Sequence, residues 1–122
     1  MLQPRELAAH IVKSLDAKKA RTVRAIEVTE VTVLADYFVI ATATSTTHLK
    51  TLAEEIEFQL KEIGIEPHHI EGHASGNWIL LDYHSVVAHL FLQETRDFYD
   101  LERLWGDAPT VNLSVDIEGD KA

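Results

Sequence analysis

The sequence predicts an α/β (α+β) domain with a mixed five-stranded sheet and flanking helices mainly on one side. Three observations support this fold class. Residues 37–42 form a nearly continuous apolar run, which is typical of a central strand buried on both faces. Two stretches with apolar residues at three- and four-residue spacing, typical of amphipathic helices, lie before and after that run. Two short apolar segments, 78–83 and 86–92, follow with a tight turn between them.

The N-terminal elements are a helix and a strand. The helix is expected from Pro4 to about Lys18, since proline is tolerated in a first helical turn. Its apolar side chains share one face: Leu7, Ala8, Ile11, Val12 and Leu15. A first strand is expected over residues 22–28, where β-branched residues recur, and residues 29–35 are interpreted as connecting chain.

The second helix follows the central strand. Residues 44–47 supply hydroxyl side chains that can cap its N-terminus, and Gly64 ends it. Its apolar positions are Leu49, Leu52, Ala53, Ile56, Leu60 and Ile63. A strand is expected near residues 67–71. The order strand, helix, strand predicts a parallel crossover, which would be right-handed.

The C-terminal third is expected to hold a hairpin and a short helix. After a loop at 72–77, strands 78–83 and 86–92 pair antiparallel around His84 and Ser85. A helix over 96–105 would carry Phe98, Leu101, Leu104 and Trp105. A single domain is therefore expected over 1–108. Residues 109–122 form an acidic C-terminal tail, and the alternation of its apolar residues leaves open a strand or a disordered end.

Composition limits the class of protein. The 122 residues fit one domain, and a hydrophobic content of 46% is enough for a core. The absence of cysteine excludes disulfides, thiolate catalysis and cysteine-ligated zinc. No apolar run approaches the roughly 18–20 residues of a membrane span. Residues 1–20 lack the apolar centre of a secretory signal, so a cytoplasmic location and no membrane partner are expected.

Charge is distributed unevenly along the chain. The net charge is −9, from 11 Lys and Arg against 20 Asp and Glu. Residues 1–24 hold 6 of those basic residues and 2 of the acidic ones, a local charge of +4 that leaves −13 for the rest. An acidic body suits a basic protein partner and repels bare nucleic acid. Simple solubility is the alternative reason for this charge.

Histidines and serines suggest chemistry that the spacing does not support. His68 and His69 are adjacent on an expected strand and so point to opposite faces, while His73 lies in a glycine loop; no metal site is expected. Two Ser-His-Asp sets can be drawn, namely Ser45, His48 and Asp36, and Ser85, His84 and Asp82. Neither serine lies in a Gly-x-Ser-x-Gly elbow, and Ser45 is better interpreted as a helix cap. No catalytic residue is expected.

Phosphate-binding motifs are also missing from the sequence. It contains neither Gly-x-x-x-x-Gly-Lys nor Gly-x-Gly-x-x-Gly. Residues 42–45 (Thr-Ala-Thr-Ser) do join a strand to a helix N-terminus, where an anion can bind. Without glycine the backbone there cannot approach a phosphate closely, and no cofactor is expected.

The hairpin is the most informative feature. Alternation places Ile79, Leu81 and Tyr83 on one face of the first strand and Trp78, Leu80 and Asp82 on the other. In the second strand Val87, His89 and Phe91 oppose Val86, Ala88 and Leu90. With two long helices and one short one, a sheet face can stay uncovered, and an exposed apolar patch with tryptophan marks a partner surface. The alternative of equal weight is that a helix covers that face and Trp78 is part of the core.

Three ordered segments resemble the signatures of a known family. The first is Asp-Tyr-Phe-Val-Ile-Ala at 36–41 with Ser-Thr-Thr-His at 45–48. The second is Glu-Gly at 71–72, Gly-Asn-Trp-Ile-Leu-Leu-Asp-Tyr at 76–83 and Val-Val-Ala-His-Leu-Phe at 86–91. The third is Arg-Asp-Phe-Tyr-Asp-Leu-Glu-Arg-Leu-Trp-Gly-Asp-Ala at 96–108. From about Glu6 to Ala108 the chain resembles the ribosomal silencing factor family, also called Iojap-like.

The resemblance implies a fold similar to nucleotidyltransferases without their catalytic residues. The sequence agrees, because no Asp-x-Asp or Asp-x-Glu pair lies on an expected core strand. It also implies a translational repressor rather than an enzyme, one that binds the large ribosomal subunit at its intersubunit face through large-subunit ribosomal protein fourteen. Bound there, it would sterically block subunit joining. The alternatives are a residual nucleotide-binding or nucleotidyltransferase-like enzyme and a homodimer formed through the apolar sheet face.

Carried onto this chain, the resemblance names partner-binding residues. They are Trp78, Leu80 and Asp82, with Tyr83 and His89 nearby, and with Arg96 and Tyr99 at the rim or bracing the sheet. The basic N-terminal segment would lie near ribosomal RNA. Two positions depart from the family pattern: His84-Ser85 stands where Gly-Asp is common, and Ala43 stands where glycine is common. These departures bear on the geometry of the hairpin turn.

Overall fold

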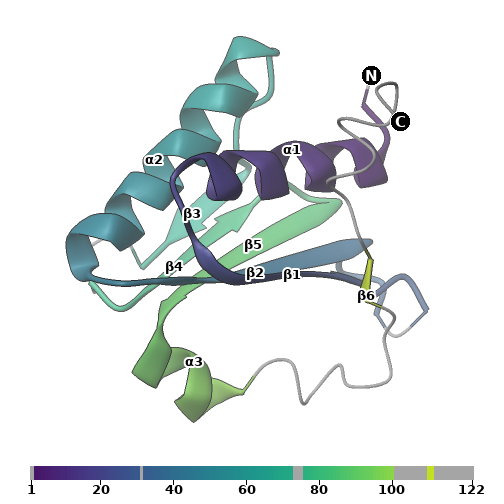
Figure 1. Cartoon of the computed structure of the whole chain (residues 1–122). Coiled ribbons are helices and arrows are strands. Elements are labelled where there is room, and N and C mark those ends of the chain that lie inside the picture. Colours follow the sequence, from purple (N-terminus) through teal and green to yellow (C-terminus); the bar gives the residue numbers. More distant parts are fainter. Residues whose placement is uncertain (1, 31, 73–75, 101–109, 112–122) are drawn as a thin grey trace.

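A computed structural model describes residues 2–30, 32–72, 76–100 and 110–111, and it has one mixed sheet with helices on both faces (Figure 1). The elements in chain order are α1 (Pro4–Ala17), β1 (Arg21–Glu27), β2 (Tyr37–Ala43), α2 (Thr46–Glu62), β3 (His69–Glu71), β4 (Trp78–Asp82), β5 (Val86–Leu92), α3 (Gln93–Tyr99) and β6 (Thr110–Val111). The strand order is β3-β4-β5-β2-β1-β6. The five expected strands are confirmed, and the two-residue β6 adds a sixth.

The sheet is mixed because one neighbouring pair is parallel. β2 pairs with β5 in parallel, whereas β1–β2, β3–β4, β4–β5 and β1–β6 are antiparallel. β3 therefore runs in the same direction as β2, as the expected crossover requires. It does not lie next to β2, however, because β4 and β5 stand between them.

The main core lies between the sheet and the two long helices, and all seven residues of β2 are buried. α1 and α2 lie together on one side of the sheet, above it in Figure 1, and this side is called the helix face below. Side chains of β4 and β5 that point to this face, including Ile79, Leu81 and Leu90, are completely buried. The expected central strand and the two expected long helices are confirmed.

Local capping explains where the long helices begin and end. In α1 the Gln3 N–H donates to the Glu6 carboxylate at 2.9 Å, and Pro4 occupies the first turn. In α2 the Ser45 hydroxyl accepts the His48 N–H at 3.1 Å, the interaction that an N-cap serine makes. Gly64 follows α2 with φ +81°, a conformation that glycine adopts without strain. None of the described helices combines the length and the apolar character needed to cross a membrane.

The third helix differs from the expectation. It starts at Gln93, directly after β5, and ends at Tyr99, rather than spanning 96–105. Asp100 terminates it in the left-handed conformation (φ 47°). Phe98 of this helix is 80% exposed, whereas Arg96 is buried. Leu101, Leu104 and Trp105 lie outside the described residues.

The segment assigned to the acidic tail contributes to the sheet. Val111 is the register partner of Ala25, and Thr110 that of Ile26. These pairings place β6 on the edge of β1 (Figure 1). The tail was expected to be either a strand or a disordered end, and residues 110–111 form a two-residue strand. Residues 112–122 lie outside the described part of the chain.

A second, smaller apolar cluster lies on the opposite side of the sheet, the side that carries α3 and is called the α3 face below. Its buried members are Ile26, Val28, Ala35, Phe38, Ile40 and Phe91. Trp78 and Val87 pack against them and are only partly buried. The alternation expected in the hairpin is therefore confirmed on both strands, and the even-numbered residues of β4 lie on the α3 face.

Candidate functional site

The candidate site is the part of the α3 face formed by the β4–β5 hairpin. Register pairs Trp78 with Phe91, Leu80 with His89 and Asp82 with Val87 across the two strands. The side chains of all three β4 residues are partly exposed, in contrast to Ile79 and Leu81 between them. The hairpin thus exposes part of Trp78, Leu80 and Asp82 on the α3 face.

Trp78 is the centre of an aromatic group. Its ring lies over Phe91 with ring centroids 5.1 Å apart, and Tyr99 of α3 approaches it at 4.7 Å. Phe98 meets Tyr99 edge-on at 5.1 Å. Phe98 and Tyr99 are 80% and 47% exposed. We call Leu80, Trp78, Tyr99 and Phe98 the aromatic strip. It runs from the hairpin onto α3, and its large apolar side chains are exposed or partly exposed.

His89 lies beneath the strip rather than on it. Its side chain is 6% exposed, and its ring contacts Phe38 edge-on at 5.1 Å and lies 6.2 Å from Trp78. Neither ring nitrogen has a hydrogen-bond partner among the described residues. Burial lowers the pKa of His89 to about 4, so the ring is neutral at physiological pH. It therefore supports Trp78 from below as an aromatic side chain.

Asp82 has a structural contact in the hairpin turn. Its carboxylate accepts the N–H of His84 at 2.8 Å. His84 has φ +69°, where a non-glycine residue is strained, which explains why glycine suits this position. The turn is closed by the Tyr83 N–H, which donates to the Val86 carbonyl at 2.9 Å. The His84 ring lies 4.1 Å from the His68 ring, at an interplanar angle of 37°.

Tyr83 is not part of the strip. Its side chain is 4% exposed and packs in the main core on the helix face. Burial raises the pKa of its hydroxyl, and the carboxylates of Glu57 and Glu66 add to this rise. The structure therefore separates Tyr83 from the other residues of the predicted partner-binding set.

Arg96 braces the sheet, one of its two expected roles. Its side chain is 5% exposed. The Nη1 group donates to the Thr22 carbonyl and to the Thr42 hydroxyl, both at 2.7 Å. One guanidinium thereby ties α3 to β1 and β2, and it fixes Tyr99 beside Trp78.

Sequence reasoning missed two residues of this region. Phe98 was not among the predicted partner-binding residues, yet it is the most exposed member of the strip. Gly72 has φ +84°, and a Cβ on it would lie 2.0 Å from the Trp78 carbonyl oxygen. Any side chain there would push β4 away, so only glycine fits. The glycine-rich composition of 72–77 gave the one available signal for this contact.

The candidate catalytic sets have structural contacts instead. His48 Nδ1 accepts the Thr44 N–H at 2.9 Å, and its Nε2 lies 2.8 Å from the Lys18 carbonyl, so the ring joins α1 to α2. The Ser85 carbonyl accepts the N–H groups of Asp36 and Tyr37. In the part of the chain that the structure describes, no three His, Asp or Glu side chains gather as a metal site. His73 lies outside it.

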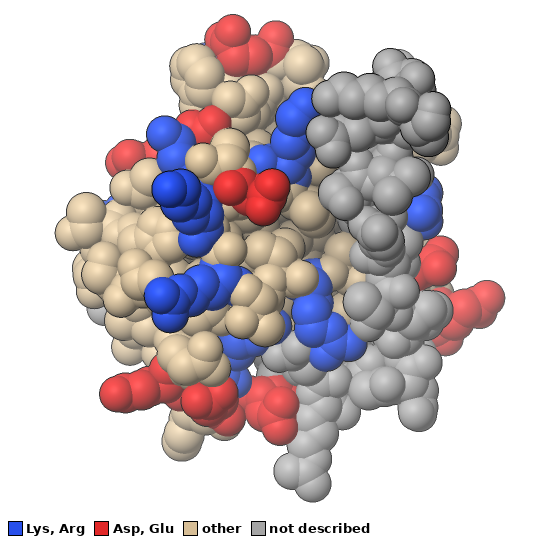
Figure 2. All heavy atoms as spheres, viewed as in Figure 1, with Lys and Arg blue, Asp and Glu red and all other residues tan. Residues whose placement is uncertain are grey.

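Basic side chains gather on another surface. In Figure 2 lysine and arginine side chains spread across the middle of the view, and most acidic side chains lie toward its margins. The exposed basic residues of α1 and of the chain leading into β1 are Arg5, Lys13, Lys18, Lys19 and Arg21. The positive charge of residues 1–24 is thus concentrated in space as well as in sequence.

Comparison with known proteins identifies the family. A family model described as "Ribosomal silencing factor during starvation" matches residues 2–122. The chain belongs to the ribosomal silencing factor family. A ribosomal silencing factor of Halalkalibacterium halodurans is 39% identical over 108 residues, which cover 88% of this chain and 92% of that protein. The maize chloroplast protein Iojap is 30% identical over 116 residues, covering 91% of this chain and 48% of that protein.

Solved structures share the fold of this family member. A crystal structure of a Chromobacterium violaceum protein has a TM-score of 0.84 and 33% identity, covering 86% of this chain and 88% of that one. A Bacillus halodurans crystal structure has a TM-score of 0.78 and 34% identity, covering 88% and 97%. The resemblance in the three sequence segments is confirmed. The family is named for regulation at the ribosome, not for a catalysed reaction.

Proposed function

We propose that the protein is a cytoplasmic translational repressor that binds the large ribosomal subunit at its intersubunit face, through large-subunit ribosomal protein fourteen, and sterically blocks subunit joining. The aromatic strip is the observation that carries this proposal. It combines two exposed aromatic residues with a partly exposed tryptophan. Aromatic anchors of this kind contribute most of the binding energy at protein interfaces.

The charge distribution supports a basic protein partner. Beyond residue 24 the chain has 5 basic and 18 acidic side chains. An acidic body is attracted to a basic ribosomal protein, which increases the association rate. The basic surface of α1 would then lie near ribosomal RNA, where its positive charge offsets phosphate charge.

A relative's name points to the same subunit. A mouse protein named "Mitochondrial assembly of ribosomal large subunit protein 1" is 37% identical over 98 residues, covering 78% of this chain and 43% of that protein. Steric occlusion requires only that a protein is bound at the surface where the subunits join, and it needs no catalytic group. That requirement is consistent with the structural contacts found for His48, Ser85 and Asp82.

Co-sedimentation with purified large subunits tests the docking surface. Trp78→Ala should lower binding at least about tenfold, because a central aromatic anchor contributes about 2 kcal/mol or more. The matched control is Phe58→Ala, which removes another exposed aromatic side chain, from α2 on the far side of the sheet. Circular dichroism confirms that both variants fold. If Trp78→Ala binds as well as the Phe58→Ala control, the assignment of the strip is wrong.

Subunit joining tests the mechanism. Light scattering follows the association of small and large subunits, and the wild-type protein should reduce the scattering amplitude in proportion to the large subunits it occupies. The Trp78→Ala variant should inhibit only at correspondingly higher concentration. Binding to large subunits without any inhibition of joining would contradict steric blocking while leaving the docking surface in place.

A further inference from the structure

A cleft lies at the carboxyl ends of β2 and β5, away from the aromatic strip. These two strands are parallel neighbours in the sheet. After β2 the chain continues into α2 on the helix face, and after β5 it continues into α3 on the α3 face (Figure 1). In open sheets, ligands bind outside the carboxyl ends of strands at such a switch point. The cleft has a volume of about 560 Å³, within the range of small-molecule sites.

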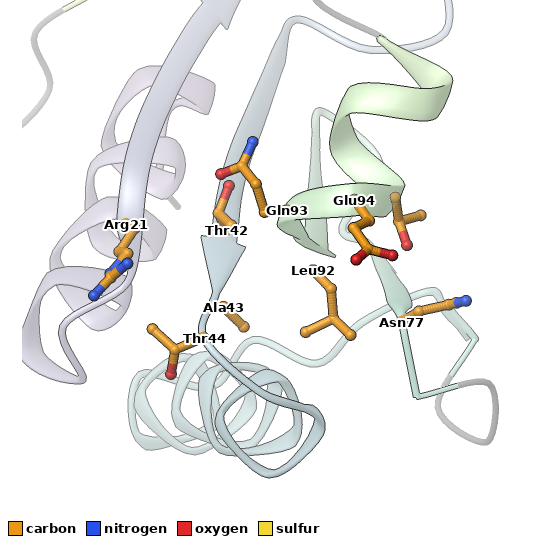
Figure 3. Close-up of a pocket in the computed structure, with 9 residues that line it drawn as sticks. Arg21, Thr42, Ala43, Thr44, Asn77, Leu92, Gln93 and Glu94 are labelled. Atoms are coloured by element: carbon orange, nitrogen blue, oxygen red, sulfur yellow. The ribbon is translucent and has the colours of Figure 1, made fainter.

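The walls of the cleft differ in chemistry. Arg21 stands on one side, and Glu94 of α3 and Asn77 stand on the other (Figure 3). The strand ends Ala43 and Leu92 lie between them and form an apolar floor. A ligand that fills the cleft therefore meets a positive group, an apolar surface and a negative group in turn.

A backbone irregularity sets the position of Arg21. The pairing of β1 with β2 shifts register between Arg21 and Arg24, and Thr22 between them has φ +47°. A β-branched residue rarely adopts this conformation, and bulges of this kind redirect side chains beside functional sites. The Thr22 carbonyl is held there by Arg96. Arg21 is the register partner of Thr42 at the end of β2. It is not a member of the aromatic strip.

The side chains that line the cleft indicate which class of ligand it binds. Arg21 is exposed and makes no ion pair with the described residues, and a guanidinium binds phosphate through two hydrogen bonds. The Thr44 N–H already donates to His48, so side chains rather than backbone amides face the ligand. Glu94 can accept hydrogen bonds from the two ribose hydroxyls, as acidic residues at switch points do. A polyphosphate would bring excess negative charge toward Glu94 with one arginine to offset it.

We infer that this cleft binds a ribonucleoside 5′-monophosphate, with the phosphate at Arg21, the ribose hydroxyls at Glu94 and the base over Leu92. Residues 42–45, which join β2 to α2, form part of the wall through Thr42, Ala43 and Thr44. The inference is independent of the aromatic strip, because neither Arg21 nor Glu94 is a member of it.

Calorimetry on the full chain without ribosomes tests this site, using the four common ribonucleoside 5′-monophosphates. At least one should bind with a Kd below about 1 mM, a free energy of about −4 kcal/mol. Arg21→Gln and Glu94→Gln should each weaken that binding at least about tenfold, as expected for the loss of a charge-assisted hydrogen-bonding group. Lys13→Gln is the matched control, since it removes an exposed positive charge from α1 outside the cleft.

Four results with nucleotides or phosphate would overturn the inference. They are the absence of binding by all four nucleotides, equally tight binding of inorganic phosphate, equally tight binding of the 2′-deoxy nucleotide, and affinity unchanged in both cleft variants. A short RNA oligonucleotide that binds more tightly than the mononucleotide would also overturn it and indicate a nucleic-acid groove. Co-sedimentation of Glu94→Gln with large subunits should match the wild type, so a failed nucleotide site and a failed docking surface are distinguishable.

Discussion

The two faces of β4 use neighbouring residues of the same strand in different ways. On the helix face Ile79 and Leu81 are completely buried against α1 and α2. On the α3 face Trp78 and Leu80 are only partly buried, although they are just as apolar. The difference indicates that odd-numbered positions of this strand hold the fold together, whereas even-numbered positions remain partly accessible at the surface.

The largest expected effect comes from the pair Leu81→Ala and Leu80→Ala. Leu81→Ala leaves a cavity in the main core and should lower the free energy of unfolding by about 3 kcal/mol or more. Leu80→Ala should lower it by about 1 kcal/mol, because its side chain is already partly in water. Urea unfolding measures both. Equal losses would show that the α3 face is as much a core as the helix face.

Arg96→Met tests how firmly α3 is held on its face. The substitution keeps the length of the side chain but removes the donors to the Thr22 carbonyl and the Thr42 hydroxyl. Leaving those groups without this partner should cost about 2–3 kcal/mol in urea unfolding. Lys61→Met, at an exposed cation on α2, should change stability by less than about 0.5 kcal/mol. Similar values for the two variants would contradict a bracing role for Arg96.

The pH dependence of stability reports the environment of His89. Its pKa is about 4 in the folded chain against 6.5 for the free side chain, so the unfolded chain binds more protons between these values. Stability from this residue is therefore complete above about pH 6.5 and decreases as the pH falls toward 4, by about 2 kcal/mol at pH 4.5.

His89→Phe should remove that part of the pH dependence. The comparison is urea unfolding at pH 7 and pH 4.5 for the wild type and the variant, in which all other titrating groups are shared. The wild type should lose about 2 kcal/mol more than the variant between the two pH values. An identical loss in both proteins would mean that His89 is not buried in its neutral form.

The smallest stability effect is expected for Phe98→Ser. The side chain is 80% exposed, so its removal should change the free energy of unfolding by less than about 0.5 kcal/mol. Binding to large subunits should nevertheless fall, because the strip loses an apolar contact. Phe58→Ser on α2 is the control for both measurements. A loss of stability without a loss of binding would place Phe98 in the core and remove it from the strip.

Local sequence features predicted most of the fold and only part of the site. The apolar run of β2, the Ser45 cap and the alternation in β4 each depend on neighbouring residues, so the sequence was sufficient to predict them. The bounds of α3 were predicted wrongly, because the helix is held by contacts of Arg96 with Thr22 and Thr42, which are distant from it in the sequence.

The remaining differences between prediction and structure concern an element that is very short and contacts between residues that are distant in the sequence. β6 has two residues, too few for a pattern, and it exists through its pairing with β1. The cleft at the switch point combines side chains from β1, β2, β5 and α3 with Asn77, and no single segment contains the arrangement. Burial separated Tyr83 from Trp78 as alternation requires, although sequence proximity had grouped them as contact residues.

The position of Trp78 gives the protein an optical reporter of its own. The sequence has two tryptophans, so a Trp105→Phe variant leaves Trp78 as the single indole emitter. A protonated imidazole quenches indole fluorescence, but His89 beside it has a pKa of about 4 and is therefore neutral well above that pH. Emission should therefore be constant from pH 8 to about pH 5.5. Transfer of the partly exposed ring out of water on docking should shift that emission to shorter wavelength, which allows ribosome binding to be followed without a label.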